Sequence, residues 1–272
     1  MKLDNISKKS IFSSIGNISD ENDLNLFLRY VNYNKNFICN FPHIIYSLNG
    51  NRTLCDKSET IIKNIFSGST VEFIFSENLG HTFGTLLLDN LIFKKSSELV
   101  QYDYIWKFSN DTIVDSSLLT VDIPIFDFYY INNIGCNCFV SECKNVDDIL
   151  FDIKTKKYFY PQTNYYIIKN KTIFYPTSED IYKLHNQFIK RENKNLKPWD
   201  IIMGCECENF LRITAEKNNL SSYMLLNDLE LKQIIKLVYD FKIWDGSHKN
   251  IAYKRLGNLC HFQWSDKEVI LI

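Results

Sequence analysis

Gln101-Tyr-Asp-Tyr-Ile-Trp-Lys-Phe-Ser-Asn-Asp-Thr-Ile-Val114 is the stretch that decides the fold. Its first part is apolar and aromatic, as in a strand that is buried on both faces, and it ends in the polar tip Ser109-Asn-Asp-Thr112. In open α/β sheets, ligands bind outside the carboxyl ends of the strands. The sequence therefore predicts that Asp111 faces a ligand or a metal ion rather than the core.

The segments before this stretch alternate between strands and helices. Strands are predicted over 37–48 and 70–76, and helices over 55–67 and 85–99. This alternation predicts an α/β fold with a Rossmann-like, mostly parallel central sheet flanked by helices, and a ligand crevice along the strand ends. Polar or glycine-containing tips follow the strands, and we expect them to line one edge of the sheet. For Asn49-Gly50, an ordinary turn is an equally good interpretation.

The two ends of the chain differ from this middle part. Residues 1–19 are polar and predict a loosely held arm, after which Asp20 is expected to cap a helix. From Ile123 onward, aromatic runs with Pro and Asn punctuation predict a smaller antiparallel portion. Thr177 is a capping signal for a helix over 178–191. Further helices are predicted from Glu206 and over 225–239. With no linker or repeat, residues 20–272 are expected to form a single domain.

Composition narrows the class of protein. The chain has 272 residues, of which 45% are hydrophobic and 23% charged, as in a globular protein. The formal net charge is -1, so no overall field favours nucleic acid or an anionic membrane as a partner. The N-terminus carries no apolar signal segment, and no stretch approaches the roughly 18 apolar residues of a spanning helix. We therefore expect a cytoplasmic protein with no membrane span and no nucleic-acid partner.

The eight cysteines include the groups Cys136-x-Cys138, Cys143 and Cys205-x-Cys207. Without a secretory signal they are expected to be reduced thiols. A metal-thiolate site is the second interpretation. It is less favoured because the one-residue spacing departs from the spacing of about two to four residues in structural zinc sites.

The run Ser76-Glu-Asn-Leu-Gly-His-Thr-Phe-Gly84, the helix after it and the strand 102–111 resemble the nucleotide-sugar-binding half of family 2-like GT-A glycosyltransferases. In that fold, an Asn-x-Gly segment precedes a helix that leads to a strand ending in a metal-binding Asp-x-Asp. The resemblance covers residues 37–115 in sequence pattern and the remainder by architecture. It implies a donor half over about 37–122 and an acceptor half over about 123–272. This chain has Ser109-Asn110-Asp111 at the metal position, so only Asp111 matches a ligand.

The resemblance implies a nucleotide-sugar donor, a glycan or glycoconjugate acceptor, and Mn²⁺ or Mg²⁺ held by Asp111 and His248. Such ions prefer oxygen ligands and are commonly held by one or two carboxylates plus substrate phosphates. His248 lies in the polar loop 245–250 and is preferred to His261, which is expected to point away from its apolar neighbours. Phosphate-loop and dinucleotide fingerprints are absent. The remaining candidates for donor binding are Ser47, Asn49, Glu77, Asn78, Gly80, His81, Lys107, Asn110 and Lys249.

An inverting transferase also needs a carboxylate base that takes the proton from the acceptor hydroxyl. Glu206 and Glu208 follow Gly204 in an apolar setting and resemble the acidic cluster that supplies this base in the family. Residues two apart cannot share one helix face, so only one of them is expected to act. The alternative is that they simply favour the dipole of the helix that they open.

Two other functions fit parts of the sequence. A sugar nucleotidyltransferase shares the alternating start but carries a glycine-rich loop with a basic residue after its first strand, of which Asn49-Gly-Asn-Arg52 is a faint echo. A noncatalytic carbohydrate- or protein-binding module would use the many Tyr and Phe rings as a platform. The sequence does not specify which sugar and nucleotide form the donor, which glycan is the acceptor, or the oligomeric state.

Overall fold

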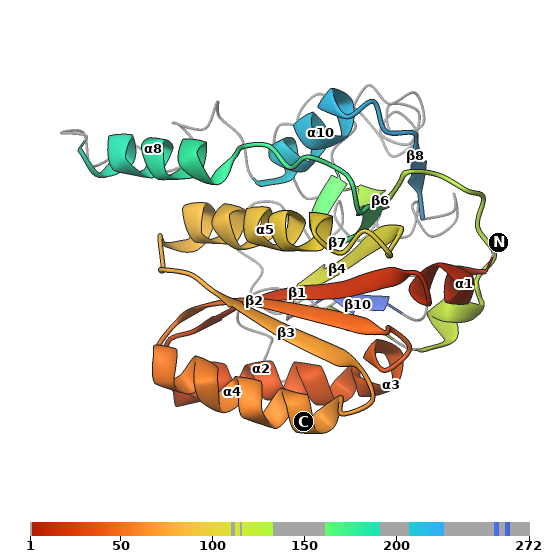
Figure 1. Cartoon of the computed structure of the whole chain (residues 1–272), viewed down its shortest axis with the longest axis horizontal. Helices are drawn as coiled ribbons and strands as arrows, with labels where there is room; N and C mark the ends of the chain where they lie inside the picture. Colours follow the sequence, from red (N-terminus) through yellow and green to blue (C-terminus); the bar gives the residue numbers. More distant parts are fainter. Residues whose placement is uncertain are drawn as a thin grey trace.

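A seven-stranded sheet forms the centre of this computed structural model, in the order β3–β2–β1–β4–β7–β6–β8 (Figure 1). The structure describes residues 2–109, 112–114, 116–132, 161–190, 207–225, 253–255 and 259–261. The strands β1 to β4 are parallel, β7 is antiparallel to β4 and β6, and β8 is parallel to β6. Their bounds are Ser10–Ile18 (β1), His43–Gly50 (β2), Thr70–Phe75 (β3), Tyr104–Ser109 (β4), Phe128–Asn132 (β6), Pro161–Lys169 (β7) and Ser222–Met224 (β8).

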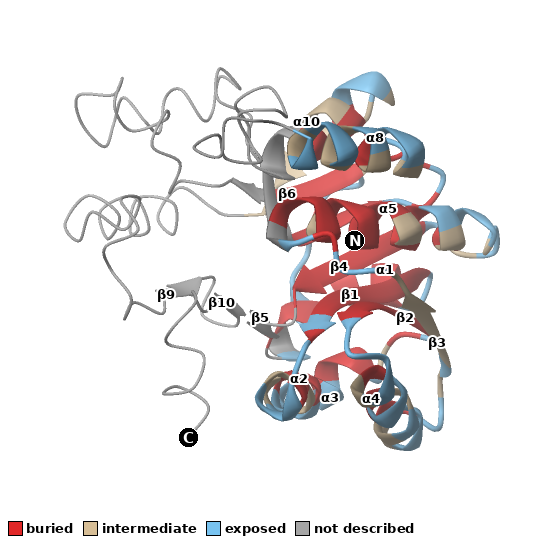
Figure 2. Ribbon diagram, turned by 90° about the vertical axis from the view of Figure 1, so that its left-hand side faces the viewer, coloured by how far each residue is buried: buried red, intermediate tan, exposed pale blue. Residues whose placement is uncertain are grey.

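Helices cover both faces of this sheet, and each face has its own apolar core. The helices α2 and α4 lie on one face, and α5 and α10 lie on the other, with α8 beside α5 (Figure 1). The strands β1, β2 and β4 are almost entirely buried, whereas β3, at one end of the sheet, is only partly buried (Figure 2). The helix bounds are Leu3–Ser7 (α1), Glu21–Tyr33 (α2), Lys35–Ile38 (α3), Arg52–Ile65 (α4), His81–Ser97 (α5), Ser178–Ile189 (α8) and Cys207–Lys217 (α10), with a 3-10 turn at Ser116–Thr120. The predicted α/β fold with a mostly parallel central sheet is confirmed.

A second, three-stranded sheet joins the end of the chain to the segment after β4. It consists of β5 (Thr112–Val114), β10 (Leu259–His261) and β9 (Tyr253–Arg255), and both pairings are antiparallel. Leu259 pairs with Val114 and His261 with Thr112. The C-terminal segment therefore returns to the carboxyl end of β4. Together with β7, this sheet supplies the antiparallel portion that the sequence predicts.

The prediction of an N-terminal arm over residues 1–19 is wrong. Residues 10–18 form β1, which lies between β2 and β4 in the middle of the sheet. Ser10, Ser13 and Ser14 make the strand look polar, yet all three are buried. Small side chains fit where helices pack closely on both faces of a sheet, so polarity here does not mean exposure.

The predicted caps of α2 and α8 are confirmed, whereas the predicted start of the strand β2 is wrong. The Asp20 side chain accepts a hydrogen bond from Asp23 N at 2.9 Å and caps α2, and Thr177 forms a capping box with Asp180 at the start of α8. The strand predicted over 37–48 instead begins at His43, after the short helix α3. Pro42, which lacks an amide hydrogen, separates the two elements.

Several predictions fall outside the described residues. These include the helix over 226–239 and the polar loop 245–250. Among the helices of the described ranges, none combines the length and apolar character needed to cross a bilayer.

Candidate functional site

The order of the parallel strands reverses beside β1. From β1 the chain adds β2 and β3 on one side and then crosses to add β4 on the other. In sheets of this kind, ligands bind in the crevice outside the strand ends at the reversal point. That crevice lies at the carboxyl edge, which is formed here by the ends of β1 to β4 at Ile18, Gly50, Phe75 and Ser109.

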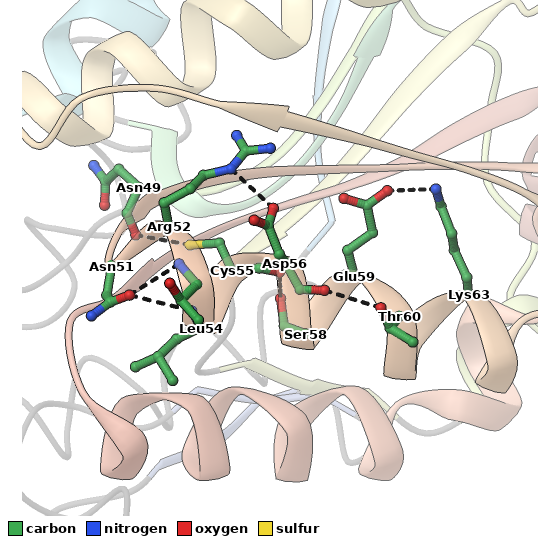
Figure 3. Close-up of polar contacts among 11 residues, drawn as sticks. Asn49, Asn51, Arg52, Leu54, Cys55, Asp56, Ser58, Glu59, Thr60 and Lys63 are labelled. Atoms are coloured by element: carbon green, nitrogen blue, oxygen red, sulfur yellow. Dashed lines mark hydrogen bonds and ion pairs between the residues drawn. The ribbon is translucent and has the colours of Figure 1, made fainter.

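Three consecutive residues at the end of β2, Asn49, Gly50 and Asn51, differ in what their side chains do. Gly50 has φ +112°, and a Cβ atom there would stand 2.3 Å from Ile18 O. Asn51 caps α4, because its Oδ1 accepts hydrogen bonds from the amides of Thr53 and Leu54 at 3.0 and 3.3 Å (Figure 3). Gly50 is thus the last residue of β2 and Asn51 the N-cap residue of α4, so neither forms a separate turn. The Asn49 side chain points away from α4 (Figure 3) and is only 4% exposed.

The loop after β3 folds back on itself through Asn78. Its Oδ1 accepts a hydrogen bond from Gly80 N at 2.9 Å, and its Nδ2 donates to Asn17 Oδ1 at 3.4 Å. Gly80 has φ +78°, which glycine adopts without strain, and it forms the N-cap of α5 with no side-chain cap. The first turn of α5 contains no acidic residue, so its positive end is not neutralised within the helix.

Gly84 brings α5 close to these side chains. A Cβ atom at Gly84 would lie 3.1 Å from Asn49 Nδ2 and 3.8 Å from Asn78 Oδ1. The three residues Asn17, Asn49 and Asn78, called the asparagine cluster below, thus converge from β1, β2 and the β3–α5 loop. Asn49 Oδ1 is buried and has no hydrogen-bond partner among the described residues. Since buried polar atoms are nearly always bonded, this oxygen points to a missing partner.

The asparagine cluster suits a neutral polar ligand. Amide side chains offer donors and acceptors together, which matches the edges of a nucleobase and the hydroxyl groups of ribose. The uncapped amides at the start of α5 suit an anion, because backbone N–H groups and the helix dipole both favour negative charge there. A nucleoside phosphate carries both kinds of group.

The helix α8 covers the start of α5. Phe83 of α5 contacts the rings of His185 and Phe188, with centroid distances of 5.3 and 5.7 Å. Burial and a hydrogen bond with Glu77 raise the pKa of Tyr182. Glu77 is exposed and lies close enough to α8 to interact with Tyr182.

Two residues predicted to bind the donor lie inside the fold. Ser47 is completely buried in β2, two residues before Asn49. Lys107 is also completely buried, and its Nζ lies 3.4 Å from Asp89 Oδ1 of α5. This placement argues against a contact between Lys107 and a donor. From the sequence alone, a lysine within an apolar strand suggests a contact with a ligand. The structure shows that Asp89, on the preceding helix α5, is the partner of Lys107 instead.

The other predicted site residues are described in part or not at all. The structure describes only the backbone of His81, at the start of α5, and of Glu208, in α10. Outside the described residues lie Asn110, Asp111, Glu206, His248 and Lys249. Their predicted roles therefore stay predictions.

The structure adds Asn17, which the sequence did not indicate, and brings back His261, which the sequence favours less than His248. Asn17 belongs to the asparagine cluster, but its strand β1 looked like a polar arm. His261 pairs through its backbone with Thr112, which directly follows Asp111 in the chain. Strand pairing over so long a separation leaves no local sequence pattern. His261 is therefore a second C-terminal histidine to consider beside His248.

Metal and thiol chemistry can be addressed only for part of the chain. Within the ranges that the structure describes, no group of three or more His, Cys, Asp or Glu residues could hold a metal ion. Among the cysteines, Cys39 is exposed and Cys55 is buried, and both are free thiols. The Cys136, Cys138 and Cys143 group and Cys205 lie outside the described residues.

No protein-family model and no curated protein sequence matches the chain. Among solved structures, the nucleoside-diphosphate-sugar pyrophosphorylase from Vibrio cholerae RC9 aligns with 79% of this chain and 90% of its own length, at 11% identity and a TM-score of 0.40. HddC from Yersinia pseudotuberculosis aligns with 60% of this chain and 78% of its own, at 14% identity and a TM-score of 0.33. HddC complexed with GMP-PN aligns with 62% of this chain and 81% of its own, at 14% identity and a TM-score of 0.35. Such low TM-scores describe a partial likeness of chain course, so the function must be argued from the residues of this chain.

Proposed function

We propose that this protein is a nucleotide-sugar-dependent glycosyltransferase that binds the nucleotide of its donor at the carboxyl edge. The observation that carries the proposal is the convergence of Asn17, Asn49 and Asn78 beside the strand reversal at β1, with Asn49 Oδ1 left without a partner among the described residues. A bound nucleoside would supply that partner from a ring N–H or a ribose hydroxyl. The nucleoside also fits the neutral character of the cluster.

The glycines at this edge keep the space for the donor open. Gly80 turns the chain into α5 with a positive φ, and Gly84 allows the first turn of the helix to approach Asn49. The amides of this first turn then face the phosphate side of the nucleotide. Binding there would use backbone donors whose positions do not change during the reaction.

Transfer leaves a nucleoside diphosphate whose growing charge needs neutralisation. We assign this task to Mn²⁺ or Mg²⁺ held by Asp111, the donor phosphates and His248, with Lys249 beside the diphosphate. The ion would stabilise the negative charge on the leaving phosphate oxygen. In the sequence, Asp111 follows Ser109, the last residue of β4, by two positions, and this order supports its assignment to the carboxyl edge.

Glu206 or Glu208 is the proposed base. The acceptor hydroxyl oxygen attacks the anomeric carbon, the bond from this carbon to the diphosphate oxygen breaks, and the carboxylate takes the hydroxyl proton. A direct attack of this kind inverts the anomeric configuration. The helix α10, in which Glu208 lies, packs on β7 and on α5, and thus on the face of the sheet that carries the asparagine cluster.

Glycosyl transfer is preferred to nucleotidyl transfer because of the connection after β1. Only Ser19 and Asp20 join β1 to α2, so the first strand is not followed by a glycine-rich basic loop. The segment Asn49-Gly-Asn-Arg52 at the end of β2 resembles such a loop only weakly, and its arginine makes contacts with nearby residues of the protein. Arg52 lies 2.9 Å from Asp56 and 3.6 Å from the centre of the Phe75 ring.

A thermal-shift panel of UDP-, GDP- and dTDP-sugars, each with and without Mn²⁺, tests the proposal. Stabilisation by one nucleotide family supports donor binding, and stabilisation by free glycans alone would favour the noncatalytic module. Product analysis then separates the two reactions. Release of the nucleoside diphosphate supports glycosyl transfer, whereas release of pyrophosphate from a nucleoside triphosphate and a sugar phosphate supports nucleotidyl transfer.

A further inference from the structure

The helix α5 is buried on nearly all sides. It lies between the sheet and α8, and its apolar side chains face both neighbours. The buried apolar residues are Phe83, Leu86, Leu87, Leu88, Ile92 and Phe93. Apolar contacts are not directional, so they hold the helix in its layer without fixing how far it slides or turns. Directional contacts are needed for that.

Two consecutive polar residues in the middle of α5 provide them. Asp89, which is 2% exposed, lies 3.4 Å from the ammonium group of Lys107 on β4. Asn90 donates a hydrogen bond to Pro176 O at 3.0 Å and accepts one from Ser178 at the start of α8. One residue therefore ties α5 to the sheet and the next ties it to the neighbouring helix.

The ion pair between Asp89 and Lys107 is costly in its surroundings. The neighbours of Lys107 in the sheet are Ser13 on β1 and Tyr166 on β7, and its Nζ lies 5.5 Å from the centre of the Tyr166 ring. Burial raises the pKa of Asp89, and Lys107 opposes that rise. Replacing a buried ion pair by apolar residues of similar size is often neutral or stabilising, so stability alone does not account for the pair.

The register of α5 matters at the carboxyl edge. Gly84 approaches Asn49 closely, and the amide of Gly80 bonds to Asn78. The approach of Gly84 to Asn49 depends on where α5 stands along its axis, because Asn49 belongs to β2, whereas the bond from Gly80 to Asn78 joins residues that are two apart in one loop. A displacement of about 1 Å is enough to spoil a binding site. Asp89 lies about 1.4 turns beyond Gly84 in the same helix, so a contact at Asp89 sets the position of Gly84.

We propose that Asp89 and Lys107 are positioning residues that fix the register of α5 on the sheet and thereby hold Gly84 against Asn49. Neither side chain touches the ligand. The consequence for ligand affinity rests on the proposed function, whereas the consequence for α5 does not.

The test replaces both charges together, in Asp89→Leu with Lys107→Met, so that no unpaired charge remains. The double variant is expected to unfold in urea at or above the wild-type midpoint. The amides of residues 84–88 should exchange with deuterium about tenfold faster than in the wild type, measured without ligand. The Kd for UDP, GDP or dTDP, whichever binds the wild type best, should rise about tenfold. Unchanged exchange at 84–88 would overturn the proposal.

Two further variants keep the test decisive. Ile105→Val removes one buried methyl group from the same side of β4 and should leave the exchange at 84–88 unchanged relative to the rest of the sheet. If the first double variant does not fold, the same exchange and unfolding measurements are made on Asp89→Asn with Lys107→Met. Failure of both to fold would also overturn the proposal, because the pair would then be required for folding itself. If no nucleotide binds the wild type, the proposed function fails while the exchange experiment still decides the role of the pair.

Discussion

Asn49 Nδ2 lies 3.1 Å from the point where a Cβ atom on Gly84 would stand. This approach joins the end of β2 to the first turn of α5 and is tighter than an ordinary van der Waals contact, so a side chain at residue 84 would push the Asn49 amide aside. It places a buried amide beside the amino end of a helix, at the edge of the sheet where ligands are expected.

Gly84→Ala is predicted to separate stability from ligand binding. Alanine raises helix propensity by up to about 1 kcal/mol, but its methyl group displaces the Asn49 amide. The unfolding midpoint should stay or rise, while calorimetric titration should show nucleoside diphosphate binding weakened about tenfold. Gly68→Ala is the matched control, since nothing lies within 4 Å of its Cβ position. Wild-type affinity in Gly84→Ala would contradict the account.

Gly50→Ala is predicted to damage the fold instead. The φ of +112° strains any other residue, and the new Cβ would stand 2.3 Å from Ile18 O at the end of the central strand. The free energy of unfolding in urea should fall by at least about 1 to 3 kcal/mol. A loss no larger than that of Gly68→Ala would show that the ends of β1 and β2 are less closely joined than described.

His43 is predicted to make stability depend on pH at the opposite end of β2. Burial lowers its pKa below the ordinary value of 6.5, and Lys95 adds to this, while Glu72 opposes it. Because the folded pKa lies below the unfolded one, the contribution is complete above pH 6.5 and is lost as the pH falls through the folded pKa.

Urea unfolding of the wild type and of His43→Gln between pH 5 and pH 8 checks this sign. The variant should lose less stability than the wild type as the pH falls below about 6.5. Parallel curves for the two proteins would show that His43 does not titrate differently in the folded state. The groups around His43 are Glu72 at 2.9 Å, Lys95 beyond it, and the Tyr102 ring at 5.4 Å between centroids.

Local signals in the sequence are enough to predict much of the fold. The apolar run that becomes β4 and the capping residues Asp20 and Thr177 act within a few residues, so they can be recognised without the structure. The serines of β1 are different. Only pairing with β2 and β4 buries them, and such pairing is not visible in the local pattern of the strand.

Some residues of the site can also be predicted from local sequence, and others cannot. Asn49 and Asn78 follow strands that the sequence indicates, so their common edge can be predicted from topology alone. Asn17 could not be placed there because its strand was not recognised. Lys107 was assigned to the ligand because its partner Asp89 lies on a different element, and no spacing rule connects a strand residue with a residue on the preceding helix.

Asp111→Ala is predicted to abolish glycosyl transfer and leave the fold intact. The aspartate follows β4 rather than standing inside it, so its removal should not disturb the core. Transfer is measured as release of nucleoside diphosphate, and folding as the urea midpoint. Asp103→Ala, just before the other end of the same strand, is the control and should retain wild-type activity. Full activity in Asp111→Ala would remove the metal assignment.

The most direct measurement is a calorimetric titration of UDP, GDP and dTDP into the wild type and Asn49→Ala. Asn49 Oδ1 has no partner among the described residues, and a buried amide oxygen left unbonded costs about 1 to 3 kcal/mol, so its removal should leave stability equal or higher. The account predicts that one nucleotide binds the wild type and that Asn49→Ala binds it about tenfold more weakly at unchanged or raised stability. Absence of binding to the wild type, or equal affinity in Asn49→Ala, would contradict a donor site at the carboxyl edge.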